Sequence, residues 1–164
     1  MSYQPFRTRT AGLDDARGCA YVHRTSWIET YSELLPASHW DSDTLEQRTL
    51  SWQRSLNGGK AVTVAESGRR IIGIALTNPA RELGGHHPVR ALELSCLYVI
   101  SAHHGSGAGQ ALLDAVLPDA SPAQLWVAEH NPRARRFSAR NGFTPDGARF
   151  TDENLALEEI RLVR

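Results

Sequence analysis

The chain has 164 residues, and its 18 basic and 18 acidic side chains give a formal net charge of zero at pH 7. This length fits one domain, residues 1–164, with a sizeable core, and the balanced charge provides no global field to attract nucleic acid or an anionic membrane surface. The first ten residues lack the apolar segment of a signal peptide, and the longest apolar run, Ile71–Leu76, is far too short to cross a bilayer, so we expect a cytoplasmic protein.

The N-terminal half predicts one strand, two helices and then a pair of strands. Apolar side chains recur at helical spacing from Leu13 to Tyr31, and Pro36 marks a loop after them. The polar turn 66–69 joins the two strands as a hairpin. The expected elements are the strand Gln4–Arg9, the helices 13–31 and 43–56 separated by the loop 34–43, and the strands 61–65 and 70–77.

The C-terminal half alternates between strands and helices. Asn131 followed by Pro132 predicts a helix start, and Asn141-Gly142 predicts its end. The expected elements are the strand 90–100, the helix 109–117, the strand 124–128, the helix between Asn131 and Asn141, and the strands 143–150 and 155–163. This order predicts an α/β (α+β) fold with a mixed sheet and helices on its faces.

The stretch Leu92–Leu117 is the most informative part of the chain. An apolar run meets the loop His104-Gly105-Ser106-Gly107-Ala108-Gly109, which opens directly into an apolar-periodic helix. Backbone N–H groups without partners and the helix dipole both favour an anion at such a junction. Glycine also lets the backbone come close to a ligand. We therefore expect a phosphate-bearing ligand at this loop.

Two other phosphate-binding patterns do not fit the chain. The P-loop requires Ser or Thr after Gly-Lys, whereas Gly59-Lys60 is followed by Ala61. The dinucleotide fingerprint requires a third glycine three positions after the second, and no register within residues 105–112 supplies it. A general nucleotide-binding domain is therefore disfavoured.

The loop instead resembles the Arg/Gln-x-x-Gly-x-Gly/Ala signature of the GNAT superfamily of acyl-CoA-dependent N-acetyltransferases. A second motif, Asn131-x-x-Ala134-x-x-Phe137 followed by Asn141-Gly142-Phe143, is similar to the family's N-x-x-A-x-x-F-Y-x-x-x-G-F. The resemblance covers nearly the whole chain and is to a bacterial small-molecule-type member. It implies the GNAT fold, a mixed and mostly antiparallel sheet of six to seven strands with about four helices.

The resemblance also implies that acetyl-CoA is the co-substrate and where it binds. Asn131 would reach the cofactor, although a role as helix N-cap explains this residue at least as well. The implied contacts are main-chain groups of Leu97, Tyr98 and Val99 for the pantetheine arm, and N–H groups of His104, Gly105, Ser106, Gly107, Ala108, Gly109 and Gln110 for the pyrophosphate.

The chain departs from the family pattern at two positions. His104 replaces the usual Arg or Gln, and because imidazole carries less permanent charge, we expect cofactor affinity to be weaker or pH-sensitive. Ser138 replaces a tyrosine that in many members protonates the departing thiolate. These departures keep a catalytically silent CoA-binding module as the alternative function.

Acetyl transfer to an amine requires the neutral nitrogen, and an amine with a pKa of roughly 10.4 is only about 0.1% neutral near pH 7.4. A positioned base is therefore useful. Glu93, eleven residues before His104, matches the base position of the histone-type members, although a surface glutamate is an equal alternative; Glu29 is the next candidate. Tyr98 and Ser138 are the candidate thiolate acids, and a backbone N–H near Val99 would polarise the thioester.

The remaining features add little chemistry. His86-His87 and His103-His104 lack metal-ligand spacing with any Cys or acid partner, so we expect no metal site. Cys19 and Cys96 are expected to be buried free thiols. Trp27, Tyr31 and the loop to Trp40 resemble the segment that shapes the acceptor pocket in bacterial small-molecule GNATs, and core packing explains Trp27 about equally well.

We therefore predict an acetyl-CoA-dependent N-acetyltransferase in which a primary amine attacks the bound thioester directly. The acceptor would be an amine of a small molecule or peptide, with no nucleic-acid or membrane partner. Many members of the family pair, so a homodimer is left open.

Overall fold

The computed structural model describes residues 5–164, and their contacts divide the chain into two units. The first unit contains the described residues up to Leu76 and residues 96–116, and the second contains residues 77–95 and 117–164. Each unit uses two separate stretches because β3 (Arg70–Pro79) and β4 (Leu92–Val99) run from one unit into the other. The predicted start of the first strand at Gln4 lies outside the described residues.

The elements follow the predicted order with one addition. The strands are β1 (Phe6–Thr10), β2 (Thr63–Ser67), β3 (Arg70–Pro79), β4 (Leu92–Val99), β5 (Gln124–Ala128), β6 (Thr144–Asp152) and β7 (Leu157–Val163). The helices are α1 (Ala16–Tyr31), α2 (Ala37–Ser42), α3 (Leu45–Asn57), α4 (Ala108–Val116) and α5 (Pro132–Arg140), with 3-10 turns η1 (Leu13–Asp15), η2 (Ser101–His103) and η3 (Pro118–Ala120).

The seven strands form a sheet in the order β1-β2-β3-β4-β5-β7-β6. The pairs β1–β2, β2–β3, β5–β7 and β6–β7 are antiparallel, whereas β4 and β5 are parallel. The predicted mixed, mostly antiparallel sheet is therefore confirmed.

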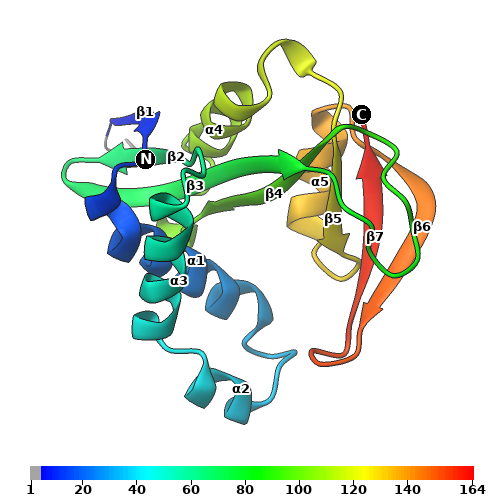
Figure 1. Ribbon diagram of the computed structural model, residues 1–164, viewed down its shortest axis with the longest axis horizontal. Helices are drawn as coiled ribbons and strands as arrows, with labels where there is room; N and C mark the ends of the chain where they lie inside the picture. The colour runs from blue at the N-terminus through cyan, green and yellow to red at the C-terminus, as the bar shows by residue number, and fades with distance from the viewer. Residues whose placement is uncertain (1–4) are drawn as a thin grey trace. The chain divides into compact units, whose positions relative to one another are not determined.

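In the first unit, the alternation of side chains along the strands creates two cores. Val64 and Ala65 are neighbours in β2, so their side chains point to opposite faces. Val64 belongs to the core with α1 and α3, which lie side by side (Figure 1), and Ala65 belongs to the core with α4. Cys19 is fully buried in the first core and the partly buried Cys96 packs against it; both thiols are free, as predicted.

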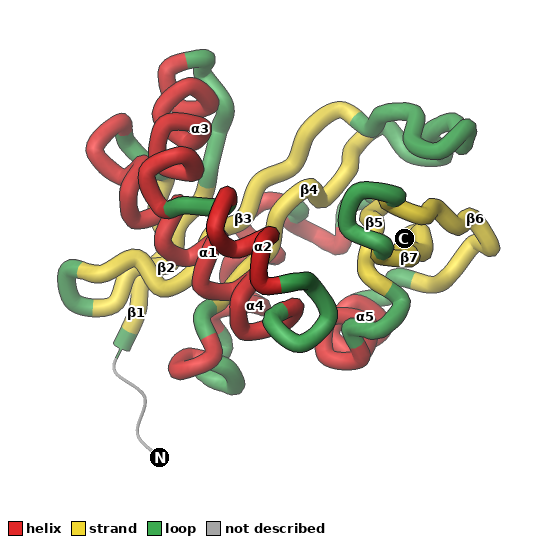
Figure 2. The backbone as a smooth tube through the Cα atoms, turned by 90° about the horizontal axis from the view of Figure 1, so that it is seen from below, coloured by secondary structure: helices red, strands yellow, loops and turns green. Residues whose placement is uncertain are grey.

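In the second unit, β7 lies between β5 and β6, and the three strands lie next to one another in Figure 2. The helix α5 starts where the sequence predicts. Oδ1 of Asn131 accepts a hydrogen bond from the Ala134 amide at 3.1 Å, and Pro132 occupies the first turn. The left-handed Gly142 (φ 83°) follows the helix. The predicted capping role of Asn131 is therefore confirmed.

The segment 34–43, predicted as a loop, contains the helix α2, so residues 5–164 hold five α-helices instead of about four. Pro36 stands directly before the first helical residue, with φ −65° and ψ 151°. Proline disrupts a helix only at interior positions, so it is compatible with a helix that begins after it.

The β2–β3 turn is shorter than predicted, because Glu66 and Ser67 belong to β2. Glu66 pairs with Arg7 of β1, and its carboxylate accepts hydrogen bonds from Arg7 and Arg9. These long-range partners extend the strand to Ser67, and the remaining elements begin or end within a few residues of their predicted positions.

Gly73 marks a close approach between β3 and its neighbours in the first unit. A Cβ atom there would lie 2.8 Å from Cδ1 of Leu112 and 3.1 Å from the Tyr98 carbonyl oxygen. We expect Gly73→Ala to destabilise the protein by about 1–3 kcal/mol through overpacking, which thermal unfolding measures. Gly12→Ala is the control, because Gly12 has φ −99° and its nearest atom would be 3.8 Å away. Equal melting temperatures for the two variants would contradict this packing.

Candidate functional site

The glycine-rich loop joins η2 to α4 in the first unit. Gly105 and Gly107 have φ values of 78° and 89°, in the left-handed region. That region costs other residues roughly 1–2 kcal/mol, so glycine is required for this turn. A Cβ atom at Gly107 would meet nothing within 4 Å, so the backbone there is open to a ligand.

The loop presents backbone donors at the N-terminus of α4. Within residues 5–164, the amides of Gly105, Gly107 and Gly109 have no hydrogen-bond acceptor. Three other amides of the loop are already engaged. The His104 and Ser106 amides donate to carbonyl oxygens at 3.0 and 3.3 Å, and the Ala108 amide donates to Oγ of Ser106 at 3.3 Å. Uncommitted amides at the positive end of a helix are typical of an anion-binding site.

His104 is turned back onto its own strand. Its Nε2 lies 2.8 Å from the Val99 carbonyl oxygen. Because a carbonyl only accepts, Nε2 carries the proton and donates in this contact. The side chain at the usual Arg/Gln position therefore anchors the loop to the end of β4.

Tyr98 lies in the strand end that the sequence assigned to the pantetheine arm. Its hydroxyl accepts a hydrogen bond from Nε1 of Trp27 at 3.2 Å, and its ring stacks on His23 with centroids 5.1 Å apart. Burial raises the pKa of Tyr98 above its usual value of 10. A phenol that holds its proton more tightly is a weaker acid for a departing thiolate.

Glu93 lies in the part of β4 that belongs to the second unit and is only 4% exposed. Its Oε1 accepts a hydrogen bond from Nε2 of Gln124 at 3.0 Å, and its Oε2 lies 3.7 Å from Nε of Arg81. Glu93 is therefore a buried carboxylate with two partners, and the alternative of an outward-facing surface glutamate is wrong.

The environment of Glu93 was missed by the sequence reasoning. Gln124 is 31 residues away in the chain and lies beside Glu93 because the two form the parallel β4–β5 register. Burial, with the charges of Asp152 and Glu93, raises the pKa of Glu159 above its usual 4.5, whereas Arg81 lowers it. No spacing rule connects these residues, so the sequence held no signal for them.

Ser138, the second candidate acid, is 5% exposed within α5. Its carbonyl oxygen accepts hydrogen bonds from the amides of Asn141 and Phe143, both at 3.0 Å. The main chain of Ser138 thus closes the end of α5, and its predicted role in catalysis stays a prediction.

Glu29, the second candidate base, belongs to the first unit. Its Oε2 accepts a hydrogen bond from the Ser101 amide at 2.8 Å. This carboxylate therefore holds the start of η2, the turn that leads into the glycine loop.

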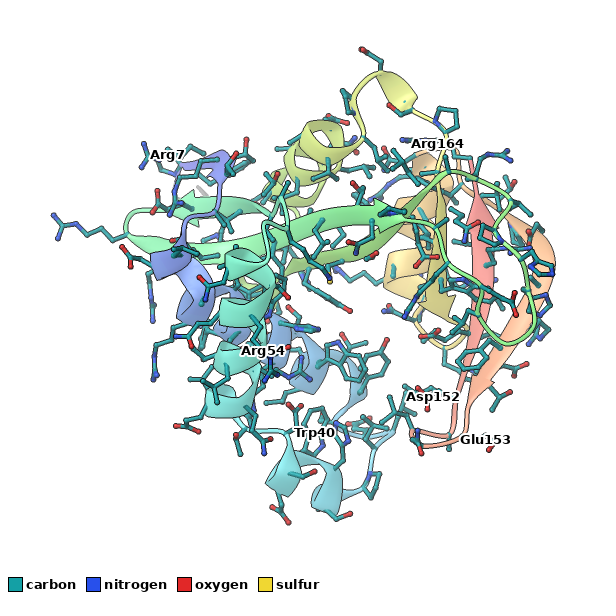
Figure 3. All side chains as sticks on the ribbon, viewed as in Figure 1. Arg7, Trp40, Arg54, Asp152, Glu153 and Arg164 are labelled. Carbon is teal, nitrogen blue, oxygen red and sulfur yellow. The ribbon has the colours of Figure 1, made fainter. Side chains whose placement is uncertain are left out.

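Aromatic rings from α1, α2, α3 and β4 form a cluster in the first unit, and Trp40 of this cluster is labelled in Figure 3. Nε1 of Trp52 donates to Nδ1 of His23 at 3.3 Å, and the Arg48 guanidinium lies 5.3 Å from the centre of the Trp27 ring. The members of this aromatic cluster are His23, Trp27, Tyr31, His39, Trp40, Trp52 and Tyr98.

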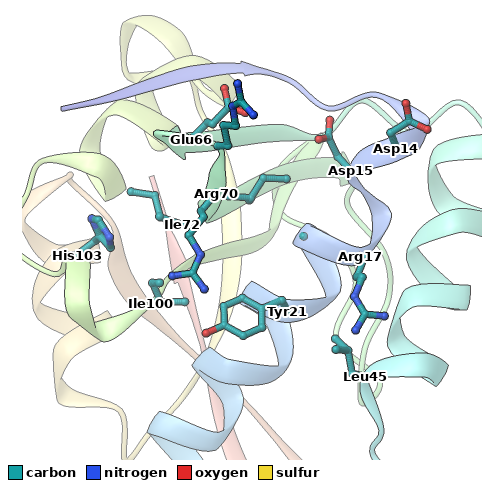
Figure 4. Close-up of a pocket in the computed structure, with 13 residues that line it drawn as sticks. Asp14, Asp15, Arg17, Tyr21, Leu45, Glu66, Arg70, Ile72, Ile100 and His103 are labelled. Carbon is teal, nitrogen blue, oxygen red and sulfur yellow. The ribbon is translucent and has the colours of Figure 1, made fainter. Parts of the chain in front are cut away.

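A pocket of about 570 Å³ lies beside the N-terminal half of α1 in the first unit (Figure 4). Charged side chains line it together with apolar ones such as Ile72 and Ile100. Two of its carboxylates, Asp15 and Glu66, are engaged by Arg9 at 2.7 and 3.2 Å. None of residues 104–110 lines this pocket, although His103, directly before the glycine loop, does.

A metal centre is not found in the part of the chain that the structure describes, where no three His, Cys, Asp or Glu side chains are grouped to hold an ion. No helix within residues 5–164 has both the length and the apolar character that a bilayer span requires.

Known protein sequences match this chain over most of its length. A model of the acetyltransferase (GNAT) family matches residues 24–143. The uncharacterized N-acetyltransferase YuaI of Bacillus subtilis is 31% identical over 162 residues, which cover 94% of this chain and 87% of that protein. A probable N-acetyltransferase of Mycobacterium tuberculosis is 31% identical over 156 residues, covering 92% of this chain and 87% of that protein.

Solved structures share the fold. An N-acetyltransferase from Staphylococcus aureus superposes with a TM-score of 0.71 at 14% identity, covering 98% of both chains. The PaiA N-acetyltransferase from Thermoplasma acidophilum, solved in complex with coenzyme A, gives a TM-score of 0.67 at 18% identity and covers 98% of this chain and 99% of that one. At these identities the likeness establishes the fold alone.

Proposed function

The chain belongs to the acetyltransferase (GNAT) family, and from this premise we propose that it transfers the acetyl group of acetyl-CoA to a primary amine. The observation that carries the proposal is the glycine loop, with its uncommitted amides at the start of α4. The structures of PaiA with coenzyme A and of yncA from Salmonella typhimurium with acetyl-CoA support the choice of co-substrate.

The loop residues fit a diphosphate. Backbone amides bind phosphate oxygens well at a helix N-terminus, and the open space at Gly107 leaves room for close approach. We assign the pyrophosphate to the loop 104–110, with the uncommitted amides of its glycines as the main donors, and the pantetheine arm to main-chain groups of Leu97–Val99. Among the described residues, β4 and β5 are paired only at Glu93 and Gln124. Leu97 follows Glu93 in β4 and so lies beyond the paired part of the two strands. Asn131 is a further proposed cofactor contact.

Glu93 is the proposed base. It would accept a proton from the acceptor ammonium, directly or through water, so that the neutral nitrogen can attack the thioester carbonyl carbon as the C–S bond breaks. A thiolate whose conjugate acid has a pKa of about 8.5 is an adequate leaving group even when no strong acid protonates it. Tyr98 and Ser138 are therefore proposed only as secondary proton donors.

Acetyl-CoA is expected to stabilise the protein against heat. Ligand at about 100 times its Kd adds about 2.7 kcal/mol, which for a chain of this size corresponds to a rise in Tm of about 5–10 °C. Differential scanning fluorimetry with acetyl-CoA, NAD and ATP measures the effect. Equal shifts with all three, or no shift with acetyl-CoA, would reject the proposal.

Gly107→Ala is expected to raise the Kd for acetyl-CoA about tenfold, because a left-handed alanine costs roughly 1–2 kcal/mol and distorts the donor loop. Gly59→Ala is a matched control, with φ 83° and nothing within 4 Å of its Cβ position. Both variants should lose similar stability, but calorimetric titration should detect weaker binding only for Gly107→Ala. Equal binding by the two variants would remove the loop from the site.

Release of free CoA over a panel of amines, peptides and antibiotics separates an enzyme from a catalytically silent CoA-binding module. The class of acceptor, the cytoplasmic location and the single-domain organisation stay predictions, and a homodimer stays open.

A further inference from the structure

We propose that Gln124 is a positioning residue for Glu93, and that it anchors Oε1 so that Oε2 is the atom that takes the proton. This inference rests on the proposed role of Glu93 as the base. The two residues face each other across the parallel β4–β5 pair in the second unit. Gln124 is completely buried, so its amide has no water with which to exchange hydrogen bonds.

The orientation of the Gln124 amide follows from its two contacts. Its Oε1 accepts a hydrogen bond from the Val89 backbone amide at 2.9 Å, and a backbone N–H can only donate. The other end of the amide, Nε2, must therefore face Glu93, where it donates to Oε1 at 3.0 Å. The Val89 contact thus fixes Gln124, and Gln124 in turn fixes one oxygen of Glu93.

The second oxygen of Glu93 is held less firmly. Its partner, Arg81, lies at 3.7 Å, and the Arg81 side chain is 73% exposed. This distance is too long for a hydrogen bond, and the exposed Arg81 guanidinium can turn away into solvent without leaving its own charge buried. An acceptor ammonium or a bridging water can therefore take the place of Arg81 at Oε2, whereas the buried amide stays at Oε1.

Gln124→Met tests this role, because it keeps a buried side chain of similar length but removes the donor to Glu93, together with the acceptor for the Val89 amide. A hydrogen bond to a carboxylate favours its charged form. Its loss should move the acidic limb of the kcat/KM profile to higher pH by about one unit and lower kcat/KM at pH 7 about tenfold. The assay uses the amine that gives the most CoA release in the acceptor panel. Gln53→Met, at an exposed position of α3, is the matched control and should leave the profile unchanged.

A double-mutant cycle separates positioning from mere structure. In the Glu93→Gln background, Gln124→Met should have no further effect, because the carboxylate it orients is gone. An equal loss in both backgrounds, or an acidic limb that does not move, would overturn the role of Gln124.

A second variant, Gln124→Glu, keeps an acceptor for the Val89 amide and so tests the role without that loss. Two carboxylates that face each other repel, so both are charged only at higher pH. The acidic limb of the kcat/KM profile of Gln124→Glu should therefore lie at higher pH than that of Gln124→Met.

The failure of this inference differs from that of the proposed function. If Glu93→Gln retains full activity, Glu93 is not the base and the inference falls with it. If Glu93→Gln is impaired but the profile of Gln124→Met matches the wild type, only the positioning role is rejected.

Discussion

Glu93→Gln is expected to lower kcat/KM at pH 7 about 100- to 10,000-fold, the range of general-base contributions. Glutamine is nearly isosteric and can accept the same hydrogen bond from Gln124, but it cannot take a proton. Activity should recover as the pH rises, because the acceptor amine then loses its proton to solvent. The measurement is a pH–rate profile of CoA release for the wild type and the variant.

The control for this experiment is Glu29→Gln. Oε2 of Glu29 accepts a hydrogen bond from the Ser101 amide, and a glutamine oxygen can accept the same bond. Glu29→Gln should therefore keep most of the activity, and both variants should keep the thermal shift with acetyl-CoA. A Glu93→Gln profile of unchanged shape would assign the base elsewhere.

His23 is expected to make the protein less stable as the pH falls from 6.5 to 4. Burial, followed by the positive charge of Arg48, lowers the pKa of His23 to about 4, and Asp43 only partly opposes this. Below pH 6.5 the unfolded chain binds a proton that the folded protein refuses, so stability is full above the unfolded pKa and is lost toward the folded pKa. The loss reaches about 3 kcal/mol, at 1.36 kcal/mol for each pKa unit.

Urea unfolding at several pH values between 7.5 and 4, for the wild type and His23→Gln, measures this loss. Glutamine retains an oxygen that can accept from Nε1 of Trp52 but does not titrate, so the variant should show a flatter dependence on pH. His130→Gln, at an exposed position, is the control and should follow the wild type. Parallel curves for the wild type and His23→Gln would show that His23 is protonated in the folded protein.

The local features of the fold could be predicted because short-range rules govern them. The cap at Asn131, the strand Gln124–Ala128 and the glycine turn before α4 are all present. Each depends on residues a few positions apart, through side-chain capping, a short apolar run or positive φ. The helix in the segment 34–43 was harder to predict from the sequence, because a helix of six residues is not stable on its own. In the structure, His39 of α2 packs against Trp27 of α1.

The sequence by itself determined the order of the elements, the glycine loop and the identity of the residues that could do the chemistry. Only the tertiary structure decided that Glu93 is buried, that Gln124 and Arg81 are its partners, and that the His104 imidazole contacts Val99. The physical reason is that a carboxylate's surroundings depend on which strand lies beside it. That choice is made by the packing of segments far apart in the chain, and a spacing pattern along one strand carries no information about it.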